Sequence, residues 1–108
     1  VIPCDNFLQL GILNIKKPKT FRAHYHLNKP VKYKETIAQE SWVIIQGEVK
    51  AFFYDLDGVF LEEAILQAGD LNVTLKGGHN YESLQPDTLV YEFKTGPYEG
   101  VETDKAFL

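Results

Sequence analysis

Short runs of β-branched and aromatic residues, separated by glycine, aspartate, asparagine and proline, recur along this chain of 108 residues. No window of a dozen residues carries the i, i+3, i+4, i+7 apolar spacing of an amphipathic helix. The pattern predicts eight or nine short strands, which include residues 7–15, 21–27, 34–37, 40–45, 48–54, 59–66, 71–75 and 88–94. Turns are expected at 55–58 and 68–70, and a tight hairpin at Gln46-Gly47. The chain is therefore expected to be all-β, a sandwich or a barrel with little or no helix.

Alternation along the expected strands indicates which face each would bury. Val49, Ala51 and Phe53 share one face of their strand, because side chains two apart on a strand point the same way. Residues 89, 91 and 93 share a face in the same manner, while Glu92 and Lys94 point to the opposite side. Such alternation is typical of sheets that pack one face on a core.

Length and composition bound the possible functions. A chain of this size is predicted to form one domain over residues 1–108, with a core at about 7–95 and an extension at 96–108. A formal net charge of −4 argues against a nucleic-acid partner. Cys4 is the only cysteine, so an internal disulfide is impossible, and no apolar run approaches the ~20 residues of a membrane span. We expect a cytoplasmic protein with no membrane partner.

The pair His24-Tyr25-His26 is the strongest chemical signal in the sequence. On a strand both imidazoles would leave the backbone in one direction and could bind one metal ion. Arg22 has the same parity, so it could reach the same place as an anion clamp or form a surface salt bridge. The one remaining histidine, His79, follows a Gly-Gly pair.

The spacing of these residues resembles the two-motif signature of the cupins. His24 and His26 precede Glu40, which is followed by six residues and Gly47; Gly69-Asp70 later leads to Gly77-Gly78-His79. A narrower resemblance is to small cupin-fold proteins, including the WbuC-like ones, of surface-polysaccharide and nucleotide-sugar gene clusters. It rests on the segments Gln39-Glu40, Phe53-Tyr54-Asp55, Gly77-Gly78-His79, Gly96-Pro97-Tyr98 and Asp104-Lys105.

The resemblance implies a jelly-roll barrel, the cupin double-stranded β-helix, with one metal inside. It carries the metal-ligand role onto His24, His26, Glu40 and His79, and Glu35 could replace Glu40 as the carboxylate. Such a set suits a divalent transition metal, with Fe, Mn, Zn, Ni and Co all plausible. If Glu40 faces the barrel interior, Trp42 and Ile44 face inward with it.

Three functions remain open on these residues. The first is a metal-dependent enzyme, of the isomerase or epimerase type, acting on a sugar or sugar-nucleotide in polysaccharide biosynthesis. Tyr81, Glu35 and Arg22 are its candidate catalytic residues. The second is a binding module without turnover for a small oxygenated ligand, and the third is a metal-free cupin ketoisomerase. A homodimer is expected, paired through residues 7–15 as an edge strand.

Overall fold

The computed structural model describes residues 2–30 and 37–108. In these residues it contains six strands and one short helix: β1 (Glu40–Gln46), β2 (Glu48–Tyr54), β3 (Phe60–Gln67), β4 (Leu71–Thr74), β5 (Gly78–Ser83), β6 (Leu89–Lys94) and α1 (Val101–Asp104). The all-β class predicted from the sequence is confirmed. The strands occupy 40–94, a shorter stretch than the core expected at 7–95.

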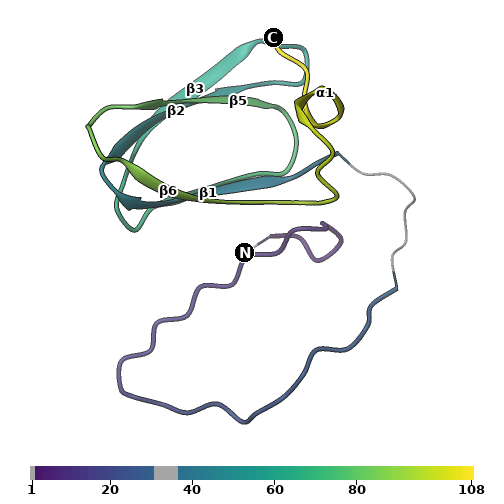
Figure 1. Cartoon of the computed structure of the whole chain (residues 1–108), viewed down its shortest axis with the longest axis vertical. Coiled ribbons are helices and arrows are strands. Elements are labelled where there is room, and N and C mark those ends of the chain that lie inside the picture. The colour runs from purple at the N-terminus through teal and green to yellow at the C-terminus, as the bar shows by residue number, and fades with distance from the viewer. Residues whose placement is uncertain (1, 31–36) are drawn as a thin grey trace.

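Two antiparallel sheets of three strands face each other (Figure 1). β1 is central in the first sheet, with the order β4-β1-β6, and β2 is central in the second, with the order β3-β2-β5. The described strands form two separate sheets and no closed barrel, so the cupin-type jelly roll remains an expectation.

The core lies between the two central strands. Ile44 of β1 and Val49 and Ala51 of β2 are exposed by at most 1%. On β2 this is the face that alternation predicts to be buried. On β6 the alternation is reversed: the apolar residues 89, 91 and 93 are 45–59% exposed, whereas Glu92 and Lys94 line the space between the sheets. Burying each large aliphatic side chain stabilises the fold by about 1.5–3 kcal/mol relative to leaving it exposed.

The turn at Gln46-Gly47 is a corner between the sheets, so the hairpin predicted there is wrong. β1 and β2 do not pair with each other, because each is the centre of its own sheet. Gly47 has a φ of +89°, and a Cβ placed on it would lie 2.5 Å from Thr88 Oγ1. By contrast, the turn at 55–58 does join the paired strands β2 and β3, with the Gly58 N–H donating to the Asp55 carbonyl at 2.9 Å.

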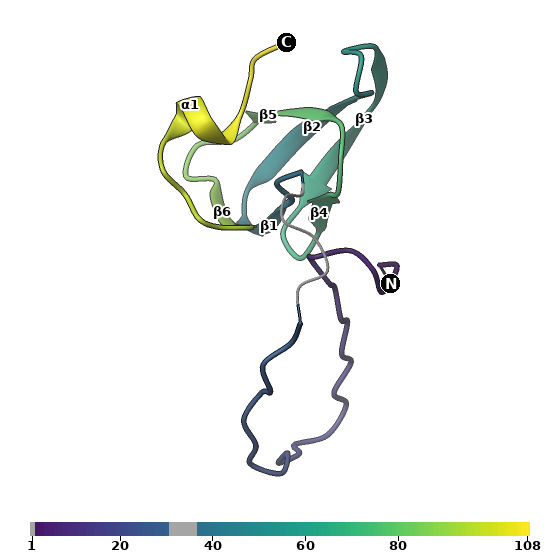
Figure 2. The same cartoon turned by 90° about the vertical axis from the view of Figure 1, so that its right-hand side faces the viewer.

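The strands predicted at 7–15 and 21–27 are not formed. Residues 2–30 contain no strand, and residues 10–30, here called the arm, run as an extended loop away from the sheets in both views (Figures 1 and 2). Leu8 N–H donates to Gln39 Oε1 at 2.7 Å, which ties the start of this region to the chain just before β1. Apolar alternation favours extended backbone, but a strand also needs a partner for its ladder, and no strand among residues 2–30 and 37–108 pairs with the arm. Most of the expected strand 34–37 lies outside the described residues.

The extension predicted at 96–108 is ordered and returns across the open side of the sandwich (Figure 2). Its one-turn helix α1 places Asp104 beside Lys94 of β6, with Oδ2 and Nζ 3.4 Å apart. No helix in the described part of the chain has the length and apolar character needed to cross a membrane.

Candidate functional site

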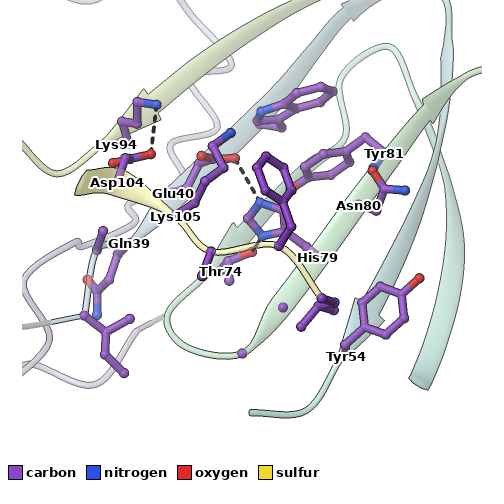
Figure 3. A pocket seen from close by; sticks show the side chains of 18 of the residues that line it. Gln39, Glu40, Tyr54, Thr74, His79, Asn80, Tyr81, Lys94, Asp104 and Lys105 are labelled. Atoms are coloured by element: carbon purple, nitrogen blue, oxygen red, sulfur yellow. Dashed lines mark hydrogen bonds and ion pairs between the residues drawn. The ribbon is translucent and has the colours of Figure 1, made fainter. Parts of the chain in front are cut away.

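A cavity of about 780 Å³ lies between the sheets and is open at the side where residues 104–108 pass (Figure 3). The first sheet contributes Glu40, Trp42, Thr74, Glu92 and Lys94; the second contributes Tyr54, Gly78, His79, Asn80 and Tyr81. Cavities of this size are typical of small-molecule sites. The lining combines aromatic rings with several charged groups, so it is suited to a polar ligand rather than to a hydrocarbon.

Glu40, His79 and Thr74 form a hydrogen-bonded chain inside this cavity. Glu40 Oε1 lies 3.2 Å from His79 Nε2, and Thr74 Oγ1 lies 2.9 Å from His79 Nδ1 (Figure 3). With a neutral imidazole, Nε2–H donates to the carboxylate and Nδ1 accepts the Thr74 hydroxyl proton. Both ring nitrogens therefore have partners, which fixes the orientation of His79.

Sheet register explains why Glu40 meets these groups. Glu40 opens β1, and its lateral neighbours are Thr74 on β4 and Lys94 on β6. Trp42, two residues later, is flanked in the same way by Asn72 and Glu92. The inner face of the first sheet is therefore polar at the end where β1 begins, and it becomes apolar further along the same strand.

The Gly77-Gly78 pair brings His79 close to the first sheet. Gly77 has a φ of +96°, and a Cβ on it would lie 2.8 Å from the Tyr54 carbonyl oxygen. Only glycine combines that backbone conformation with so close an approach to β2. β5 can therefore start beside the end of β2, and His79 is the second residue of β5.

Charge in the cavity favours an ionised Glu40. The hydrogen bond from His79 lowers the pKa of Glu40 from its ordinary value of 4.5. Partial burial opposes this shift, and electrostatic attraction to His79 and Lys94 adds to it. Lys94 Nζ lies 3.2 Å from Glu92 Oε1, and this pairing raises the pKa of Lys94. The cavity thus presents a carboxylate beside a fixed ammonium group.

Trp42 and Tyr81 form an aromatic stack across the cavity. Their ring centroids are 3.9 Å apart and their planes differ by 8°. The Tyr81 hydroxyl donates to Asn72 Oδ1. Burial, with the charge of Glu40 as a smaller cause, raises the pKa of Tyr81. Tyr81 therefore stays protonated at neutral pH, which favours a hydrogen-bonding role over the general-base role suggested by the sequence.

Of the four expected metal ligands, the structure brings two together. Glu40 and His79 meet in the cavity, whereas His24 and His26 lie exposed on the arm and are not among its lining residues. The two arm imidazoles do lie side by side, with centroids 5.3 Å apart, as their i, i+2 spacing predicts. Arg22 is also exposed on the arm, and its carbonyl contacts His24 Nδ1 at 2.8 Å. Glu35 lies outside the described residues.

The described residues fit a metal only in part. Glu40 and His79 offer one carboxylate and one imidazole, and within residues 2–30 and 37–108 no third His, Cys, Asp or Glu joins them to form a group that could hold an ion. Thr74 does suit such a site, because a hydroxyl on Nδ1 would orient the ring for ligation through Nε2. The prediction of a metal site therefore depends on whether further donor groups reach Glu40 and His79.

Several residues of the site were not predicted from the sequence. Thr74 and Asn72 hold the functional groups of His79 and Tyr81, and residues 105–108 line the cavity. Strand parity could have placed Thr74 and Asn72 on the same face of their strand, but it could not show that this strand lies beside the one that carries Glu40. No protein-family model, curated protein or solved structure matches this chain. The resemblance to the cupins stays a prediction.

Proposed function

We propose that the cavity binds a small, oxygen-rich molecule of the sugar or sugar-nucleotide class. The observation that carries this proposal is the ionised Glu40, oriented by His79, beside the Trp42–Tyr81 stack in one cavity of about 780 Å³. Carboxylates and amides bind hydroxyl groups, and aromatic rings pack against apolar faces. A sugar offers both kinds of surface.

Each lining group has a distinct task in this proposal. Glu40 accepts hydrogen bonds from ligand hydroxyls, and Lys94 donates to a ligand oxygen or holds a negative group. Trp42 and Tyr81 supply the apolar contact. The expectation that the ligand belongs to polysaccharide biosynthesis rests on the cupin resemblance alone.

Proton transfer is a second candidate function, favoured by the Glu40–His79–Thr74 chain. A carboxylate that orients an imidazole is a recurring arrangement for general acid–base catalysis. Isomerisation of a hydroxy-carbonyl compound needs a group that removes a proton and returns it, and His79 is the described residue best placed to do so. Turnover of a ligand found in the binding test would separate an enzyme from a binding module.

Metal binding is a third candidate, favoured by the Thr74 contact with His79 Nδ1. Glu40 and His79 would hold a divalent first-row ion, and the ion would orient adjacent oxygens of the ligand and act as a Lewis acid. The remaining expected ligands, His24 and His26, would have to come from an arm. Metal content tests whether the arm histidines are ligands. It is measured in the double variant His24→Ala plus His26→Ala and, for comparison, in Glu40→Gln. Unchanged metal in the double variant would eliminate the four-ligand set.

A ligand screen tests the binding proposal. Sugars, nucleotide-sugars and hydroxy acids are titrated calorimetrically, with and without added divalent metals. We expect at least one class to bind and to lose affinity in both Glu40→Gln and His79→Asn, while Glu62→Gln on β3, outside the cavity, keeps it. The proposal would be overturned if no compound of the panel binds, or if the affinity is the same in wild type and in both cavity variants.

A further inference from the structure

The outer face of the first sheet is apolar, and it is exposed along β6. On each strand the residues facing away from the cavity alternate with the cavity residues. They form a patch, here called the outer patch, composed of Val43, Leu71, Val73, Tyr91 and Phe93. Val43 has Leu71 and Tyr91 as its lateral neighbours, so these side chains are contiguous. Tyr91 and Phe93 are 54% and 59% exposed, and an exposed apolar patch of this kind is typical of an interaction surface.

The arm carries a second set of exposed apolar side chains. Ile12 is 74% exposed and Tyr25 87%, and the other large members are Leu13, Ile15, Phe21 and Leu27. The backbone here is extended and pairs with no strand in the described residues. A segment with this composition gains stability when it lies against an apolar sheet face.

Charge is divided sharply between the arm and the rest of the chain. Residues 6–30 hold four lysines and one arginine, and no aspartate or glutamate. Residues 37–108 hold thirteen acidic and four basic residues. The net charge of −4 therefore hides a basic arm and a strongly acidic body, which attract each other over the Debye length of about 10 Å at 0.1 M salt.

We propose that the arm of one molecule packs across the outer patch of a second copy of this chain, and that the exchange is reciprocal. One two-fold contact then covers both exposed apolar surfaces, because each copy supplies one arm and one patch. The basic arm of one copy is attracted to the acidic body of the other. This proposal does not depend on what the cavity binds.

A second copy is the occupant that the geometry favours. In both views the arm runs away from its own sheets (Figures 1 and 2). Tyr91 and Phe93 of its own outer patch are exposed, and so are the large apolar side chains of the arm. The homodimer expected from the sequence is thus retained, but it is formed by an arm on a sheet face and not by an edge strand at 7–15.

Sedimentation equilibrium of the full chain at micromolar concentration tests the proposal. We expect a dimer whose Kd rises at least about tenfold with Ile12→Ser plus Leu13→Ser in the arm, and likewise with Tyr91→Thr plus Phe93→Thr in the patch. The Kd also rises in a variant that reverses three charges of the arm, Lys16→Glu, Lys17→Glu and Lys19→Glu. Leu61→Thr on β3, an equally exposed apolar residue outside the patch, leaves the Kd unchanged.

Mixing the two defective variants gives a sharper test. The arm variant keeps its patch and the patch variant keeps its arm, so the mixture retains one of the two contacts and associates more tightly than either variant alone. A wild-type monomer would overturn the proposal. This holds whether the arm of that monomer is free in solution, packs on its own outer patch or binds nucleic acid. A dimer that ignores both the arm and the patch substitutions would overturn it as well.

Discussion

Glu40 Oε1 and His79 Nε2 lie 3.2 Å apart, although the two residues come from different sheets. The contact closes the polar end of the sandwich, where β1 and β5 both begin. Thr74 on the other nitrogen of His79 completes the chain. The account of the cavity depends on this arrangement, and its parts can be tested one at a time.

The depressed pKa of Glu40 predicts a pH-dependent stability. The folded protein holds the Glu40 proton less tightly than the unfolded chain does, so the contribution of Glu40 is fully present above the ordinary pKa of 4.5 and is lost as the pH falls through the lower folded value. Glu40→Gln should lower the free energy of unfolding at neutral pH by about 1–2 kcal/mol. Urea unfolding from pH 7 to pH 3 should show the two proteins converging in acid; a constant difference would contradict this cause.

The Thr74 hydroxyl is predicted to hold the ring of His79 through Nδ1. Thr74→Val keeps the shape of the side chain and removes the partner of Nδ1, at a cost of about 1 kcal/mol. The Nδ1 chemical shift of His79 should move in Thr74→Val, because that nitrogen loses its hydrogen bond, and should stay close to the wild-type value in Thr74→Ser. Identical shifts in all three proteins would show that the hydroxyl does not hold the ring.

Two glycines with similar backbone angles separate the cost of positive φ from the cost of a close contact. Gly69 has a φ of +94° with nothing within 4 Å of an added Cβ, and Gly77 has a φ of +96° with the Tyr54 carbonyl oxygen 2.8 Å away. Gly69→Ala should cost about 1 kcal/mol and Gly77→Ala about 2–3 kcal/mol. Equal costs in chemical denaturation would mean that β5 can move away from β2.

Residues 105–108 are predicted to shield the cavity. They are among its lining residues, and Leu108 approaches Gly78 closely enough that a Cβ there would lie 3.2 Å from Leu108 Cδ1. Trp42 is the only tryptophan and also lines the cavity, so its fluorescence reports access. Ending the chain at Asp104 should increase acrylamide quenching of Trp42, whereas Phe60→Ser on β3 should not. Unchanged quenching after truncation would show that these residues do not cover Trp42.

The sequence predicted the parts of this protein that depend on local pattern. Alternation placed Val49 and Ala51 on one face of their strand, which is in the core, and the turn at 55–58 was recognisable from its aspartates and Gly58. It could not reveal that Gln46-Gly47 leads from one sheet to the other, because a corner and a hairpin use the same turn residues.

Only part of the site, the pair of Glu40 and His79, was predicted from the sequence. Glu40 and His79 were expected to meet, and they do, but the cupin spacing that paired them also assigned His24 and His26 to the same point. Those two histidines lie on a segment whose apolar alternation is strand-like and which has no strand partner in the described chain. Pairing between distant segments is a tertiary property, and parity alone does not encode it.

The most direct test of the central claim is a titration followed through the ring resonances of the three histidines, which give a spectrum simple enough to assign. With a bound sugar or nucleotide-sugar, the account predicts that the His79 signals shift while those of His24 and His26 remain in place. A ligand that moves the arm histidines and leaves His79 unchanged would contradict it.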